Sequence, residues 1–185
     1  LRRVGLRPWM LLYYNEKRRI SYYGVHRFQR LHTGRSPNAV HGVGGGQERR
    51  RQARWGAQVI LTGGPGDYDK TLGDAIFNAV PVINMIGRTK PKQLLALIEQ
   101  ADLLICPDTG PSHMGAAVGT PVIALHAVTS ADVSGPYIYR ELAVDCYPEA
   151  VKTVLKKKPA TNIWGTHAHG SETMKLVTVD AVIAK

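Results

Sequence analysis

The chain has 185 residues, of which 44% are hydrophobic and 21% charged, and its formal net charge is +10. This length suffices for one α/β domain with an appendage and is too short for two domains of ordinary size. The charge-free run of residues 109–131 contains three glycines, two prolines and two histidines, so we expect no transmembrane helix. Residues 1–10 lack an apolar core followed by a small-residue cleavage site, so we expect a cytoplasmic protein. Cys106 and Cys146 form no CxxC pair, and we expect buried free thiols rather than a disulfide framework or a zinc site.

The positive charge is confined to one part of the chain. Residues 1–55 carry 13 Lys and Arg and two Glu, a net charge of +11, whereas residues 56–185 are almost neutral at −1. We therefore predict a basic, irregular N-terminal arm over residues 1–55 and a folded domain over residues 56–185. Such an arm could bind a nucleic acid or an anionic membrane surface, or it could be a solvated segment. Nucleic acid is the less favoured partner, because the arm contains no recognised nucleic-acid-binding motif.

Elements follow one another regularly only after residue 56. Before it, a strand over Val25–His32 is conceivable, but the Gly- and Arg-rich residues 36–54 keep no hydrophobic period. Beyond it, apolar segments predict strands at 59–61, 82–86, 103–106 and 122–125. Helical spacing or helix-start signals predict helices at 68–79, 92–101, 112–118, 148–157 and 179–184. Strands that alternate with helices over short loops predict an α/β fold with a Rossmann-like parallel sheet.

The segment Leu103–Pro121, LLICPDTGPSHMGAAVGTP, carries the clearest site signal. Its strand delivers Asp108 and Thr109 to the carboxyl edge of the sheet, where open α/β sheets bind ligands. Gly110 permits a close approach, Pro111 presets the first helical turn, and the N-terminal amides of the helix attract an anion such as a diphosphate. His113 could add a hydrogen bond from the same side. Alternatively, Asp108 and Thr109 only cap the helix, and the residues alone leave this choice open.

A second glycine-containing loop follows the strand at 59–61. Its sequence is Thr62-Gly63-Gly64-Pro65-Gly66, in which backbone without side chains can approach a ligand closely. The alternative is a plain turn. Because both loops follow strands of one parallel sheet, we expect them at the same edge.

The motif DTGPSHMGAAVGTPVIAL at 108–125 resembles the hallmark segment of glycosyltransferase family 9, the ADP-heptose:lipopolysaccharide heptosyltransferases. Similar segments flank it in order: VILTGGP at 59–65, INMIGRT at 83–89, LLALIEQADLLICPDTG at 94–110 and CYPEAV at 146–151. The resemblance covers about residues 56–155. It implies the GT-B fold, two Rossmann-like domains facing a cleft, of which this chain resembles the C-terminal, donor-binding one.

The resemblance also implies roles for the residues of the two loops. In the segment 108–113, Asp108 would lie near the sugar, Thr109 and Gly110, with Pro111 beside them, would contact the diphosphate, and His113 would reach a phosphate oxygen.

In the loop at 62–66, Thr62, Gly63 and Gly64 would line the nucleotide. An acidic residue after it, Asp67 or Asp69, would face the ribose or the adenine.

The function that the resemblance implies is inverting transfer of heptose from ADP-heptose to the lipopolysaccharide inner core, without a metal or another cofactor. The general base is expected in an N-terminal acceptor domain, which this chain does not resemble, so we expect donor binding with weak or absent transfer. The protein would work in the cytoplasm, in peripheral contact with the inner membrane. A non-catalytic nucleotide-binding fragment and a nucleic-acid or membrane-surface binder acting through the basic arm are the alternatives. His167 and His169 are expected in a loop rather than in a metal site.

One part of the chain departs from the family pattern. LHTG at 31–34 resembles the start of a family segment, but the Trp-Pro pair expected after it is missing, and Arg35 is at best a displaced substitute for the expected basic residue. A shifted reading frame would produce the Arg- and Gly-rich run at 36–54, and we offer this as a hypothesis.

Overall fold

The computed structural model describes residues 9–14, 58–80 and 82–185. The strand considered at Val25–His32 and the Arg- and Gly-rich run at 36–54 lie outside these residues.

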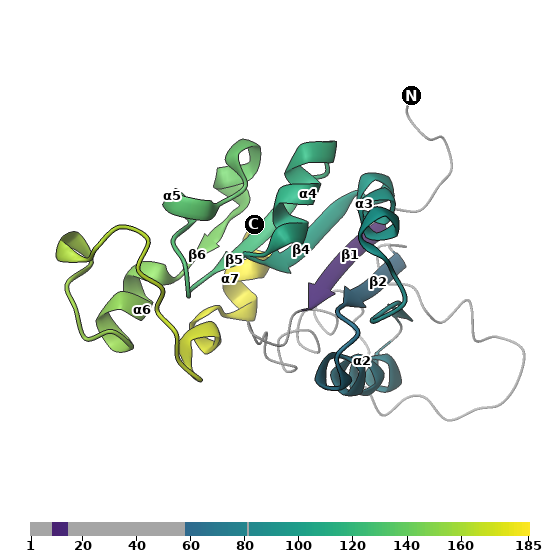
Figure 1. Ribbon diagram of the computed structural model, residues 1–185, viewed down its shortest axis with the longest axis horizontal. Helices are drawn as coiled ribbons and strands as arrows, with labels where there is room; N and C mark the ends of the chain where they lie inside the picture. The colour runs from purple at the N-terminus through teal and green to yellow at the C-terminus, as the bar shows by residue number, and fades with distance from the viewer. Residues whose placement is uncertain (1–8, 15–57, 81) are drawn as a thin grey trace, which may run out of the picture.

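The described residues build a parallel sheet of six strands in the order β3-β2-β1-β4-β5-β6 (Figure 1). The strands are β1 (Trp9–Tyr14), β2 (Gln58–Gly63), β3 (Ile83–Asn84), β4 (Leu103–Pro107), β5 (Val122–His126) and β6 (Val144–Asp145). The predicted α/β class with a Rossmann-like parallel sheet is confirmed. The strand predicted at 82–86 is shorter than expected, because the chain turns after Asn84.

Strand β1 occupies a central position in the sheet, although the sequence pattern predicts no element there. Its residue Leu11 is in register with Ile60 of β2 on one side and Leu104 of β4 on the other. The sequence WMLLYY is a continuous apolar run, which is typical of central parallel strands. Residues 9–14 therefore belong to the sheet, although they lie within the segment 1–55 that charge sets apart.

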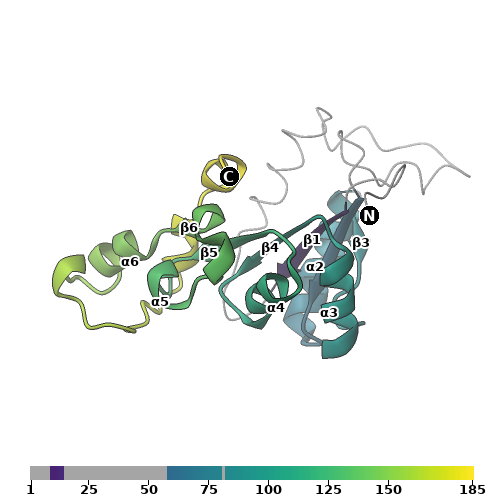
Figure 2. The same ribbon diagram turned by 90° about the horizontal axis from the view of Figure 1, so that it is seen from above.

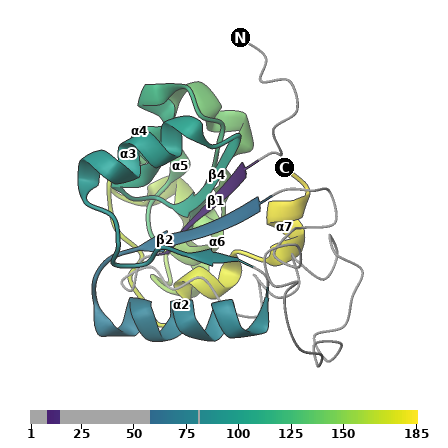
Figure 3. The ribbon, with the colours of Figure 1, turned by 90° about the vertical axis from the view of Figure 1, so that its right-hand side faces the viewer.

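Helices cover both faces of the sheet, which gives a three-layer α/β structure. The helices are α2 (Asp67–Ala79), α3 (Pro91–Gln100), α4 (Gly110–Val118), α5 (Ala131–Ser134), α6 (Tyr147–Thr153) and α7 (Val179–Ile183). Figure 3 shows α3 and α4 on one face and α2 on the other. Helices α5 and α6 lie at the β6 end of the sheet, away from α2 and α3 (Figure 2). No helix of the described residues has the length and apolarity needed to cross a membrane.

The alternation of side chains along the strands decides which layer each strand residue contacts. Leu104 and Cys106 of β4 belong to the buried cluster with residues of α3 and α4. Ile105 between them belongs to the cluster on the opposite face, which includes residues of α7. Because both faces are covered, β4 and β5 are apolar at almost every position, as the sequence shows.

The ends of α6 differ from the prediction, whereas the C-terminal end of α4 agrees with it. The helix predicted at 148–157 begins one residue earlier and ends at Thr153, and Lys156 beyond it has a positive φ of 55°. Helix α4 ends at Val118. The next residue, Gly119, is its C-cap and has a φ of 78°, in the left-handed region that favours glycine. The short elements α5 and β6 and the 3-10 helices at Tyr137–Leu142, Pro159–Thr161 and Thr173–Leu176 are not predicted, because they are too brief to show a period.

Candidate functional site

The carboxyl ends of β2, β1, β4 and β5 are consecutive along one edge of the parallel sheet. The loop at residues 62–66 leaves β2, and Asp108 and Thr109 follow β4. One strand, β1, separates β2 from β4. Since neighbouring strands lie about 4.8 Å apart, the two loops leave the sheet about 10 Å from each other. The structure therefore brings both predicted site segments to one edge.

Asp108 is a buried carboxylate held by hydroxyl groups from two other elements. Its Oδ2 accepts a hydrogen bond of 2.6 Å from the Oγ of Ser134, the last residue of α5. The same oxygen accepts a short hydrogen bond from the Oγ1 of Thr129, which follows β5. The Asp108 carboxyl group is thus held in place by two hydroxyl groups at the start of α4.

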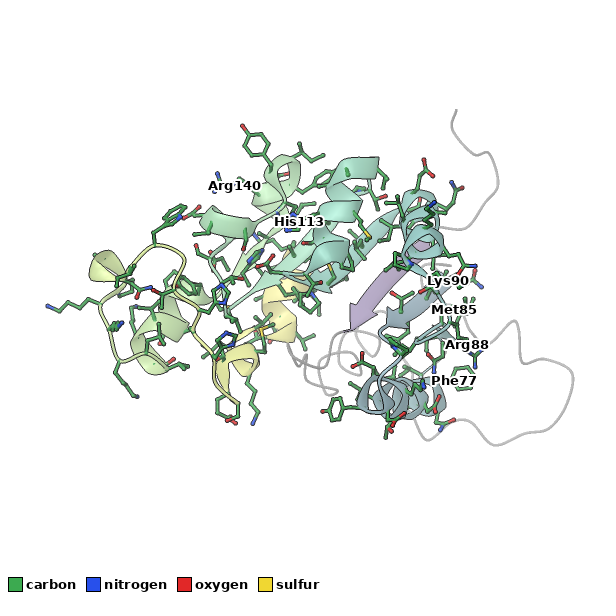
Figure 4. All side chains as sticks on the ribbon, in the orientation of Figure 1. Phe77, Met85, Arg88, Lys90, His113 and Arg140 are labelled. Carbon is green, nitrogen blue, oxygen red and sulfur yellow. The ribbon has the colours of Figure 1, made fainter. Side chains whose placement is uncertain are left out.

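Two histidines lie near this carboxylate, one facing each of its oxygens. His113 Nε2 lies 3.9 Å from Asp108 Oδ1, and His126 Nδ1 lies 3.9 Å from Oδ2. These distances are longer than hydrogen bonds, so the contacts are electrostatic. The side chain of His113 is 57% exposed on the first turns of α4 (Figure 4), whereas that of His126 is fully buried. His113 is therefore the histidine of this pair that a ligand can reach.

Thr109 does not cap α4 with its side chain. It occupies the N-cap position, but its Oγ1 donates to the carbonyl of Pro107 at 3.1 Å. Its own carbonyl accepts hydrogen bonds from Ser112, at 3.0 Å from the backbone N and 2.7 Å from Oγ. For Thr109, the capping alternative is wrong, because the hydroxyl points back toward β4.

Gly110 and Pro111 are the first two residues of α4, which begins two residues earlier than the helix predicted at 112–118. Pro111 is buried and sets the entry of the helix. Gly110 is exposed, and a Cβ built on it would meet no atom within 4 Å. Packing therefore does not require a glycine at position 110, and the surface beside its backbone is open.

The loop after β2 is shaped by a buried carboxylate. Gly64 donates its backbone N–H to Asp69 Oδ2 at 3.1 Å, and Asp69 is 5% exposed. A Cβ on Gly64 would lie 2.9 Å from that oxygen, so a larger residue here would displace the Asp69 carboxylate. Gly63 accepts a hydrogen bond of 3.2 Å from the N–H of Gly87. The two glycines are thus part of a defined loop.

The remaining predicted residues of this loop differ in accessibility. Thr62 is fully buried, whereas Gly63 and Gly64 are half-buried, so the glycine backbone is the part of this loop that a ligand can reach. The side chain of Asp67 is fully exposed at the start of α2, with Lys70 Nζ at 3.8 Å. Of the two acidic candidates, Asp69 shapes the loop and Asp67 faces solvent.

Both cysteines are free, and Cys106 is buried while Cys146 is half-buried. Burial raises the pKa of Cys106 well above its ordinary value, and the charge of Asp108 raises it further. Burial, followed by the charge of Asp145, also raises the pKa of Cys146. Both thiols are therefore neutral near pH 7 and are poor nucleophiles.

His167 and His169 lie in an irregular segment, as expected, with their ring centroids 5.4 Å apart. Within residues 9–14, 58–80 and 82–185, no three His, Cys, Asp or Glu side chains are grouped as metal ligands.

Thr129, Ser134 and His126 are site residues that the motif does not contain. Thr129 and His126 lie at or just after the end of β5, next to β4. The rule that neighbouring parallel strands end at one edge could have pointed to them. Ser134 lies on α5, which no period in the sequence marks.

A scan against protein families matches residues 49–163 to the model of glycosyltransferase family 9 (heptosyltransferase). The chain is 35% identical over 102 residues to the lipopolysaccharide core heptosyltransferase OpsX of Haemophilus influenzae. This match covers 55% of the chain and 29% of the relative, so the chain spans less than a third of that protein.

Solved structures share the fold. The chain superposes on the glycosyl transferase family 9 protein of Veillonella parvula with a TM-score of 0.61 and 16% identity, over 97% of this chain and 45% of that one. For the Escherichia coli ADP-heptose lps heptosyltransferase II, the TM-score is 0.57 at 19% identity, over 96% and 45% of the two chains. The chain thus spans about half the length of these structures.

Proposed function

Because the chain belongs to glycosyltransferase family 9, we propose that its described domain binds ADP-heptose as the donor for inverting transfer to the lipopolysaccharide inner core. The observation that carries this proposal is the fixed Asp108 carboxylate next to His113 at the start of α4. The names of the relatives, which are heptosyltransferases acting in lipopolysaccharide biosynthesis, support the choice of substrates.

The diphosphate of the donor would bind at the N-terminus of α4. The partial positive charge of the helix end attracts an anion, and the open surface at Gly110 allows the diphosphate to approach the backbone. His113 would donate a hydrogen bond to a phosphate oxygen, which a protonated imidazole can do from either nitrogen. During transfer, the same groups would stabilise the negative charge that develops on the leaving ADP.

The nucleoside would lie along the edge toward β2. The loops after β4 and β2 are about 10 Å apart, a span that a bound nucleoside diphosphate can bridge. The backbone of Gly63 and Gly64 would line it, with the buried Thr62 behind them. Asp67, with its exposed carboxylate, is the acidic residue we assign to the ribose or adenine, and Asp69 would keep the loop in shape.

The sugar would lie beside Asp108, on the side of Oδ1. Attack by the acceptor hydroxyl requires a general base. We propose that this base belongs to an acceptor domain and that the 185-residue chain alone binds the donor with weak or absent transfer. We also propose that the acceptor is lipopolysaccharide core and that the reaction takes place at the cytoplasmic side of the inner membrane, with peripheral contact.

Calorimetric titration of the purified chain with ADP-heptose, ADP and UDP tests donor binding. We expect selective binding of ADP-heptose and ADP, with weakened affinity in Asp108→Ala and His113→Ala. His167→Ala is the matched control, since His167 is also exposed but lies in the irregular segment. Equal binding of ADP and UDP would contradict the adenine preference. Binding of ADP without a contribution from the heptose would favour the non-catalytic nucleotide-binding alternative.

A further inference from the structure

Helix α5 is anchored at its start by Asp145 at the end of β6. Asp145 Oδ2 accepts a hydrogen bond of 2.9 Å from the N–H of Ala131, and its Oδ1 accepts one of 2.8 Å from the N–H of Tyr147. Ser130 caps the helix by accepting a hydrogen bond from the N–H of Asp132 at 3.2 Å. The start of α5 is therefore fixed relative to the sheet.

The end of α5 is equally constrained. Ser134 Oγ lies 2.6 Å from Asp108 Oδ2 and 3.3 Å from the carbonyl oxygen of Ser130. A Cβ on Gly135 would lie only 2.5 Å from the carbonyl oxygen of Ala131, so the chain turns tightly over the helix. The hydroxyl of Ser134 thus reaches Asp108 from a rigid support.

The two hydroxyls occupy the same oxygen of the carboxylate. Thr129 and Ser134 both donate to Oδ2, while His113 faces Oδ1. His126 faces Asp108 from β5, and the thiol of Cys106 on β4 is influenced by its charge. With Oδ2 held by both hydroxyls, the carboxylate plane cannot rotate, and Oδ1 stays directed at His113.

We propose that Thr129 and Ser134 are positioning residues of the donor site: they hold Asp108 so that its Oδ1 orients the His113 imidazole toward the donor diphosphate. This inference rests on the proposed function. In it, Asp108 acts on the diphosphate through His113, and the four side chains work as one unit rather than as independent contacts. An imidazole N–H directed at the diphosphate can donate a hydrogen bond to a phosphate oxygen.

The test is a double-mutant cycle on the binding of ADP, with adenosine as a probe that lacks the phosphates. We expect Ser134→Ala to weaken ADP binding about tenfold, because a hydrogen bond to a charged group is lost, and to leave adenosine binding unchanged. In the His113→Ala background, the same substitution should cause little further loss, because the group that it positions is absent.

Two matched controls separate positioning from general damage to the fold. Val133→Ala shortens an exposed side chain of the same helix without removing its cap or the Ser134 hydroxyl, and ADP affinity should stay at the wild-type value. Thr129→Val should weaken ADP binding, while Thr129→Ser, which keeps the hydroxyl, should restore it.

Each outcome decides a different question. If Ser134→Ala lowers the affinities for ADP and adenosine equally, the positioning role is wrong and the proposed function stands. The same holds if Ser134→Ala lowers the affinity for ADP by the same factor in the His113→Ala background as in the wild type. A loss in Thr129→Ser as large as in Thr129→Val would also overturn the positioning role. Absence of ADP binding by the wild-type chain would overturn the proposed function and this inference with it.

Discussion

We expect Gly115→Ala to destabilise the domain, although alanine is the better helix former. Gly115 lies in the middle of α4, where it faces the sheet. A Cβ at this position would lie 2.6 Å from Val122 Cγ2 and 3.0 Å from Leu104 Cδ2. Both neighbours are 0% exposed and belong to the buried cluster between the sheet and α3. The helix must therefore shift away from β4 and β5 to accommodate one methyl group.

The net effect follows from two opposing contributions. Replacement of glycine by alanine inside a helix contributes about 1 kcal/mol of stability. Carbon atoms in contact prefer about 3.5–4.0 Å, and overpacking of a buried site costs about 1–3 kcal/mol. Because the shorter of the two distances is far below contact, we expect a net loss of about 1–2 kcal/mol. For a domain of this size, this corresponds to a fall in Tm of about 3 °C for each kcal/mol.

Urea denaturation followed by circular dichroism measures this loss, and Gly110→Ala is the control. Gly110 begins the same helix, and an added Cβ meets nothing within 4 Å, so its free energy of unfolding should stay within about 0.5 kcal/mol of the wild type. The same variant should weaken ADP binding if the diphosphate approaches the Gly110 backbone. If Gly115→Ala proves as stable as the wild type, the close packing of α4 on the sheet is refuted.

Three further predictions concern other parts of the domain. Burial raises the pKa of Cys106 above its ordinary value of 9.0, so the unfolded chain releases this proton at lower pH than the folded chain. The contribution of the protonated Cys106 thiol to stability is present below pH 9 and is lost above it at about 1.4 kcal/mol per pH unit. Urea titrations at pH 8 and pH 10 should show that the free energy of unfolding falls less for Cys106→Ala than for the wild type. An equal fall in both proteins would contradict this prediction. Gly119 has a φ of 78°, so Gly119→Ala should lower the stability of the domain by about 1 kcal/mol, and Gly119→Asn should lower it less. Thermal melts in which Gly119→Asn is the less stable of the two variants would count against the left-handed cap. Asp69→Ala should lower stability by about 1–3 kcal/mol, because the N–H of Gly64 loses its hydrogen-bond partner. Asp67 is exposed, so Asp67→Ala should change stability by under about 0.5 kcal/mol. Similar losses in the two variants would disprove the separate roles of the buried and the exposed carboxylate.

The pattern of the sequence was sufficient for the fold class and for the position of the main site segment. Buried parallel strands such as β4 and β5 are nearly continuous apolar runs, and the helices between them keep a local period. The turn from Asp108 to Pro111 carries its own geometry, because Pro111 presets the helix and Asp108 follows a strand that ends at the ligand-binding edge. These are properties of neighbouring residues, so they can be read without knowledge of distant contacts.

The central strand β1 was not predicted, although WMLLYY is an apolar run of the same kind as β4 and β5. The surrounding positive charge pointed instead to an arm. The six residues of β1 are separated from β2 by more than forty positions, and its place between β2 and β4 follows from the pairing of Leu11 with Ile60 and Leu104, which no local pattern encodes.

By itself, the sequence determined the α/β class with a Rossmann-like parallel sheet, and it placed Asp108 directly after a strand that ends at the carboxyl edge of that sheet. Only the tertiary structure decided what holds Asp108, since Thr129 and Ser134 lie 21 and 26 positions away and meet its carboxylate through the docking of β5 and α5. It also decided that Asp69 is buried under the glycine loop while Asp67 remains in solvent. Burial and hydrogen-bond partners depend on which elements pack together in space, and spacing along the chain does not encode that choice.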